Sequence, residues 1–102
     1  MNEIDFVLWL KANETPRKLC SDHVSRIKRI ERSIADCDID EEYARDRCHT
    51  LLSLFAHTGK NKEMEARMIV DLPIGKYHLS AFTYSIRKYV AFRDEASLLL
   101  KE

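Results

Sequence analysis

The apolar side chains between residues 24 and 34 recur every three or four positions, which is the spacing of one face of an α-helix. They are Val24, Ile27, Ile30 and Ile34. A second stripe follows Tyr77 and is expected to run to about Leu100. Its members are Leu79, Phe82, Ile86, Tyr89, Val90 and Arg93. Because each stripe must be buried against another element, the pattern predicts helices packed on helices.

Shorter helices are expected around these two. Residues 3–13 carry Phe6, Val7 and Leu10 at helical spacing, and Pro16 ends that segment. Ser21 is then a suitable N-cap for the helix that bears the first apolar stripe. The sequence therefore predicts a first helix of about three turns and a second that begins after residue 21.

A third helix is predicted to begin at Asp40 as its N-cap and to continue to His57. Two glutamates in its first turn suit the positive end of the helix dipole. Gly59 would be the C′ residue, where a left-handed conformation is common. Residues 60–70 are compatible with a further short helix, although their periodicity is weak.

Composition narrows the fold class to all-α. The chain has 102 residues with only two glycines and two prolines, too few for a sandwich or barrel of many tight turns. Its length suits one domain, and it contains no repeats, low-complexity segments or long linkers. The expectation is a single helical domain over residues 1–102, folded as a compact bundle of four to five helices.

Targeting and redox features are sparse. Three cysteines without a CxxC pair indicate neither a disulfide framework nor a zinc knuckle. The N-terminus lacks the basic region of a signal peptide, and no apolar run approaches the roughly 20 residues that cross a bilayer. We expect a cytoplasmic protein with no membrane association and no cofactor.

Zero net charge conceals a strongly uneven charge distribution. Residues 16–32 hold six basic and two acidic side chains, a local charge of +4. Residues 36–46 hold six acids against Arg45 alone, a local charge of −5. Residues 76–93 hold four basic side chains and no acid. The two basic segments coincide with the two helices predicted from the apolar stripes.

This distribution has two interpretations. The basic segments could form a face that contacts phosphates, with Arg26, Arg29 and Arg32 spaced three residues apart along one helix. Tyr84 lies off the apolar stripe of its helix and is the best candidate for an exposed aromatic. Alternatively, the charges are solvated and paired within the molecule, which is the common outcome for a charge run.

No catalytic or metal-binding constellation stands out. The stretch from His23 to Arg26 spells HxxR, a fragment of a recombinase active site, but the residues that would complete that site are missing. Cys48 and His49 lie eight or nine residues from His57, and eight residues span about 12 Å along a helix, too far for one metal ion. The alternating acids of residues 38–42 lack the glycine and glutamate of a calcium loop. We expect a protein that is not an enzyme and has no metal site.

Three stretches resemble one family. SDHVSRIKRIERSI and HLSAFTYSIRKYVAFRDE resemble the first and last helices of the N-terminal core-binding domain of phage integrases and other tyrosine recombinases. The opening FVLWLK is similar to the short helix with which such domains begin, and the resemblance covers most of residues 4–95. It implies a SAM-like bundle that grips one side of duplex DNA. The chain would then be a fragment, or a free-standing relative, without the catalytic domain.

The resemblance also implies which side chains contact DNA. They come from the second and last helices and are Arg26, Lys28, Arg29, Arg32, Lys76, Tyr84, Arg87 and Lys88. The acidic segment 36–46 is unusual for a DNA clamp. The alternative function is therefore protein–protein interaction or self-association, in which the acidic residues 36–46 meet a basic face on a partner or a second copy.

Overall fold

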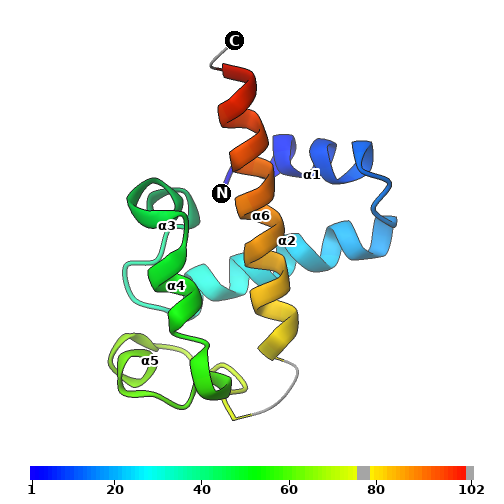
Figure 1. The fold of residues 1–102 in the computed structure, drawn as a ribbon. Helices are drawn as coiled ribbons and strands as arrows, with labels where there is room; N and C mark the ends of the chain where they lie inside the picture. The colour runs from blue at the N-terminus through cyan, green and yellow to red at the C-terminus, as the bar shows by residue number, and fades with distance from the viewer. Residues whose placement is uncertain (76–78, 101–102) are drawn as a thin grey trace.

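Helices α2 (Arg17–Ser33) and α6 (Leu79–Leu100) form the centre of the molecule and pack against each other more extensively than any other pair. α6 crosses α2 steeply (Figure 1). The two apolar stripes meet at this crossing, where Ile27, Ile30 and Ile86 are almost completely buried. The predicted stripes thus form the core, except that Val90 and Arg93 of α6 are only partly buried.

The computed structural model of the chain describes residues 1–75 and 79–100, with side chains described through residue 97. α1 (Glu3–Ala12) lies beside the first part of α2, whereas α3 (Ile39–Asp46), α4 (His49–Ser53) and α5 (Lys62–Arg67) lie on the other side of α6 (Figure 1). A 3-10 turn, η1 (Ala56–Gly59), joins α4 to α5.

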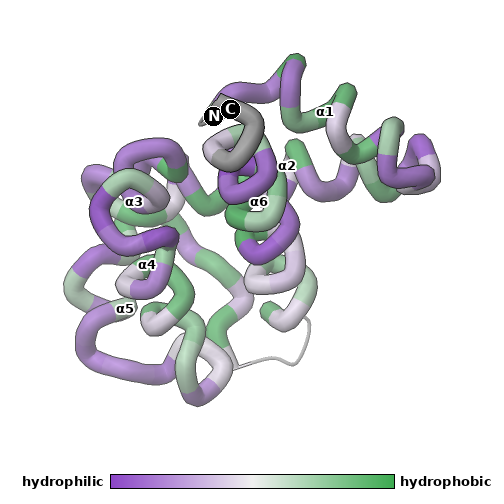
Figure 2. The backbone as a smooth tube through the Cα atoms, turned by 45° about the horizontal axis from the view of Figure 1, so that its top comes forward, coloured by the Kyte–Doolittle hydropathy of each residue, from purple (hydrophilic) through white to green (hydrophobic). Residues whose placement is uncertain are grey.

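One hydrophobic core unites these helices. Its buried members come from all six of them, including Phe6 of α1, Leu51 of α4 and Met64 of α5. Hydrophilic and hydrophobic residues alternate along α2 and α6 (Figure 2). The Cα radius of gyration is 13.6 Å, close to the roughly 13 Å of a compact 100-residue domain. The predicted all-α bundle is confirmed.

The start of α2 differs from the prediction. Ser21 is not an N-cap, because the helix begins four residues earlier, directly after Pro16. The amide of Cys20 donates to the carbonyl of Pro16 at 3.0 Å and opens the helix. A proline suits this place because its fixed φ is close to helical and its missing N–H has no helical partner to lose. Ser21 is consequently an exposed residue on the helix surface.

The predicted helix from Asp40 to His57 is wrong as one element. Arg47 and Cys48 adopt φ of +56° and +63°, so the chain ends α3 and restarts as α4. The N-cap is Asp38, whose carboxylate accepts the amide protons of Asp40 and Glu41. The break raises the number of α-helices in the described chain to six. Cys48, on the break, is fully buried.

Two short elements agree with the prediction. Residues 60–70 contain α5, which Asn61 caps by accepting the amide proton of Met64 at 2.8 Å. Gly59 has φ of +83°, as expected for a C′ glycine, although it closes η1 and not a long helix. A Cβ there would lie 2.8 Å from Ile74 Cγ2, so glycine is required both for its positive φ and for lack of space. Among the described residues, no helix combines the length and apolar character needed to cross a bilayer.

Candidate nucleic-acid interface

The basic residues of α2 separate onto its two flanks. Arg26 and Arg29 lie toward α6: Arg26 donates to Ser85 Oγ at 3.4 Å, and the Arg29 guanidinium lies 5.6 Å from the centre of the Phe82 ring. Lys28 lies toward α1, where its ammonium pairs with Glu3 at 3.1 Å. The helical sequence dictates this split, because successive residues are rotated by about 100°.

α6 adds two predicted residues to the flank that carries Arg26 and Arg29. The ammonium of Lys88 lies 5.7 Å from the centre of the Tyr84 ring, one helical turn away. Tyr84 packs edge-on against His23 of α2 and remains 44% exposed, as the sequence predicts. Arg26, Arg29, Tyr84 and Lys88 thus share the surface where the helices cross, and we call them the α2–α6 basic cluster.

A buried polar contact lies beneath this cluster. Ser85 Oγ donates to the carbonyl of Ala81 at 3.1 Å, so it accepts the proton of His23 Nδ1 at 2.7 Å. Both side chains are fully buried. His23 Nε2 has no hydrogen-bond partner among the described residues. Ser85 therefore links the two helices and helps to hold Arg26 in place.

The pKa of His23 reflects this environment. Burial, followed by the positive charges of Arg26 and Lys88, lowers the pKa of His23 below its usual range, and only Asp22 acts in the other direction. Arg26 belongs to α2 and Lys88 to α6, so cations from both helices act on this one imidazole. His23 is therefore a buried, neutral residue that lies beneath the cluster.

This buried histidine predicts a loss of stability in mild acid. As the pH falls below about 6.5, the unfolded chain binds a proton at His23 while the folded chain does not. The free energy of unfolding should then fall by up to roughly 1.4 kcal/mol per pH unit until the lowered folded-state pKa is reached. Urea unfolding at pH 7.5 and 5.5 tests this. A His23→Gln variant should lose part of the dependence; identical dependence in both proteins would contradict the assignment.

The other predicted contacts are placed differently. Arg32 is exposed near the end of α2. Arg87 is exposed on another flank of α6, where it lines a hollow of about 300 Å³ with Leu52 and Thr83. Lys76 lies outside the described residues. The structure thus gathers half of the eight predicted side chains into one cluster.

Five of the predicted DNA-contacting cations have no acidic partner among the described residues. Arg26, Arg29, Arg32, Arg87 and Lys88 form no ion pair with any carboxylate in the described part of the chain. This contrasts with Arg45, Arg47, Arg67 and Arg93, each of which is paired. No described carboxylate therefore neutralises these five charges.

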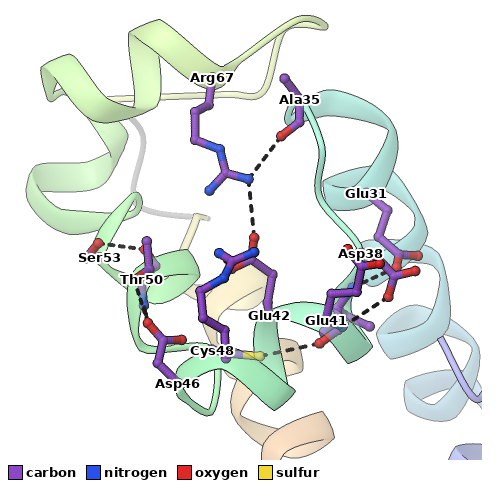
Figure 3. Close-up of polar contacts among 12 residues, drawn as sticks. Glu31, Ala35, Asp38, Glu41, Glu42, Asp46, Cys48, Thr50, Ser53 and Arg67 are labelled. Carbon is purple, nitrogen blue, oxygen red and sulfur yellow. Dashed lines mark hydrogen bonds and ion pairs between the residues drawn. The ribbon is translucent and has the colours of Figure 1, made fainter.

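The acidic segment is largely engaged within the molecule. Glu42 is fully buried, and its Oε1 lies 3.2 Å from Arg67 (Figure 3). Its Oε2 lies 3.1 Å from Arg45. Asp46 accepts the amide proton of Thr50 at 3.1 Å and so caps the break before α4. Asp38 caps α3 as described above. Glu42, Asp46 and Asp38 therefore each have a structural role within the fold, although Asp38 remains exposed.

α3 and α6 are joined by two reciprocal polar contacts. Asp40 of α3 accepts from Tyr89 and pairs with Arg93, while Asp94 of α6 accepts from Tyr43 and pairs with Arg47. The hydrogen bonds from Arg47 and then Tyr43 outweigh partial burial and lower the pKa of Asp94. The two aspartates therefore remain ionised and orient α3 against α6.

Sequence reasoning missed two basic residues that line the same groove as Lys28. Lys11 at the end of α1 and Arg17 at the start of α2 line the groove between these helices. Arg17 belongs to the first basic segment, which could have signalled it, whereas Lys11 is isolated in the sequence. The described part of the chain has no group of three or more His, Cys, Asp or Glu side chains placed to hold a metal ion.

Comparison with protein-family models, with curated proteins and with solved structures finds no match for this chain.

Proposed function

We propose that this chain is a non-catalytic module that binds the phosphate backbone of duplex DNA through α2 and α6. The observation that supports it is the α2–α6 basic cluster: cations from two helices converge on one surface beside an exposed tyrosine. None of them pairs with a described carboxylate. The resemblance to core-binding domains of tyrosine recombinases involves the same two helices and agrees with this proposal.

The chemistry of the cluster suits phosphates. Arginine presents a rigid fork of donors that matches a phosphate, and lysine adds a compact charge. Arg29 lies over the Phe82 ring and Lys88 over the Tyr84 ring. These contacts restrict both side chains in advance, so they lose less conformational entropy on binding. The hydroxyl of Tyr84 adds a donor to the same surface.

Self-association through residues 36–46 has less support. Asp38, Asp40, Glu42 and Asp46 all have intramolecular partners. Asp36 and Glu41 are exposed carboxylates of the segment for which no contact with a described side chain is seen. A pair of carboxylates on a surface gives little attraction at physiological salt.

Reversing two charges of the cluster tests the proposal. The double variant Arg29→Glu plus Lys88→Glu should lose measurable binding to a random-sequence duplex, because two phosphate contacts become repulsive. Fluorescence anisotropy between 50 and 200 mM salt should also show a log–log slope for the wild type that reflects several released counterions. The thermal unfolding of the variant should stay close to wild type, since both side chains are at the surface.

The matched control reverses two exposed cations away from the cluster. Lys60→Glu plus Lys62→Glu, at η1 and the start of α5, changes the net charge by the same amount. Its duplex affinity should fall much less than that of the cluster variant. Equal losses in the two folded variants, or retained binding in the cluster variant, would show that the cluster is not the DNA contact.

A further inference from the structure

A second basic surface lies on the opposite flank of α2. A groove of about 370 Å³ runs between α1 and α2, and its rim carries Lys11, Arg17 and Lys28. Ser21 and Ser25 add two hydroxyl groups along the same side of α2. Glu3 is the one acidic residue that lines the groove in the described chain. The rim is therefore strongly basic and rich in donors.

The single acidic residue is only loosely engaged. Glu3 pairs with Lys28 at 3.1 Å, but both side chains are about half exposed, at 45% and 51%. Exposed pairs of this kind contribute little free energy and exchange readily for another anion. Lys11 and Arg17 pair with no carboxylate among the described residues. A phosphate could therefore replace Glu3 at Lys28. Lys11 and Arg17 lie toward the other end of the groove, because Arg17 is about 16 Å from Lys28 along α2, and could contact other phosphates of the same strand.

The two basic surfaces are separated by the width of one helix. The α2–α6 basic cluster borders one flank of α2 and the groove borders the other, and a helix with its side chains is about 10–12 Å across. The major groove of B-DNA is about 12 Å wide, whereas the minor groove is about 6 Å wide. The spacing of the basic surfaces thus fits the phosphate rows on either side of a major groove.

The surface of α2 between the two flanks is also suited to DNA. Ser21 and Ser25 are exposed there, with the exposed cation Lys18 beside them. Asp22 is the acid of this surface, and Lys18 pairs with it at 4.0 Å. From Arg17 to Arg32 the helix is about 22 Å long, or roughly six base-pair steps of 3.4 Å. Short hydroxyl side chains can approach base edges without a clash.

We infer that the groove between α1 and α2 binds phosphates of the second DNA strand, so that α2 lies in the major groove between two phosphate rows. This inference rests on the proposed function and adds a second strand contact to it. Lys11, Arg17 and Lys28 bind one strand, while the α2–α6 basic cluster binds the other. Ser21 and Ser25 then face the base edges.

Glu3→Gln is the most discriminating test, because it should strengthen binding. Removing the carboxylate frees Lys28, and the duplex affinity at 50 mM salt should rise about two- to fivefold. The control Glu63→Gln removes the same charge from exposed α5 and should raise the affinity less. An equal rise in both variants would overturn the inference, since it would reflect net charge alone.

The complementary variant removes cations from the groove. Lys11→Gln plus Arg17→Gln should reduce the salt slope of duplex binding by about two, one for each lost phosphate contact. Lys60→Gln plus Lys62→Gln serves as the control of equal charge. If the groove variant keeps the wild-type slope while the cluster variant loses binding, the inference fails and the proposed function stands. If the wild type does not bind duplex DNA at 50 mM salt, both fail.

Discussion

Replacing Arg67 with methionine is expected to lower the free energy of unfolding by roughly 3 kcal/mol, because it removes a partner from a buried carboxylate. Glu42 is fully buried, and Arg67 holds its Oε1 at 3.2 Å. The same guanidinium donates to the carbonyl of Ala35 at 3.0 Å, so the substitution also loosens the end of α2 from α5 (Figure 3). Urea unfolding at pH 7 measures the loss.

Two control variants separate charge from packing. Arg45→Met removes the other partner of Glu42, but Arg45 is 55% exposed and solvent can replace it, so a loss of about 1 kcal/mol is expected. Adding Glu42→Gln to Arg67→Met should recover part of the lost stability, because burying a neutral amide costs less free energy than burying an unpaired charge. If the double variant is no more stable than the single one, Glu42 is not the source of the loss.

The sequence predicts the main helices because their signal is local. The stripe of α2 contains Val24, Ile27 and Ile30, each less than a tenth exposed. Most of the α6 stripe is buried to the same degree: Leu79, Phe82, Ile86 and Tyr89. Such periodicity needs no knowledge of what the helix packs against. It also places Tyr84 outside the core, where the structure has it.

The break between α3 and α4 depends on contacts that are distant in sequence. Arg47 adopts a left-handed conformation while pairing with Asp94, 47 residues away. Cys48 is held in the core next to it, with its sulfur 3.8 Å from the carbonyl of Ile39. Neither residue is a glycine or a proline, so nothing local marks the end of the helix. Tertiary contacts therefore override helix propensity here.

The sequence also predicts the candidate site only in part, namely where the signal lies within one helix. Helical spacing predicts that Arg26 and Arg29 share one flank of α2, and the structure agrees. Whether that flank faces α6 or α1 depends on how the helices cross, which the sequence does not specify. As a result Lys28, predicted with its neighbours, lies in a different groove, where it pairs with Glu3 of α1. Charge counts along the chain identify the basic segments, but they do not show which of these segments come together on one surface of the folded protein.

Substituting Ile27 with alanine is expected to cost 2–5 kcal/mol, because Ile27 is fully buried at the crossing of α2 and α6 and the lost methyl groups leave a cavity. For a domain of about 100 residues, each kcal/mol lowers the Tm by roughly 4–8 °C. The loss should therefore be evident in a thermal scan followed by circular dichroism.

Ile4→Ala provides a matched control for the core variant, since it deletes the same atoms from a side chain that is 77% exposed on α1. Its effect should stay within about 0.5 kcal/mol, as for most surface substitutions. A small loss at Ile27, or equal losses at both positions, would contradict the packing of α2 on α6. Because the α2–α6 basic cluster exists only where these helices cross, that result would also remove the structural basis for DNA binding there.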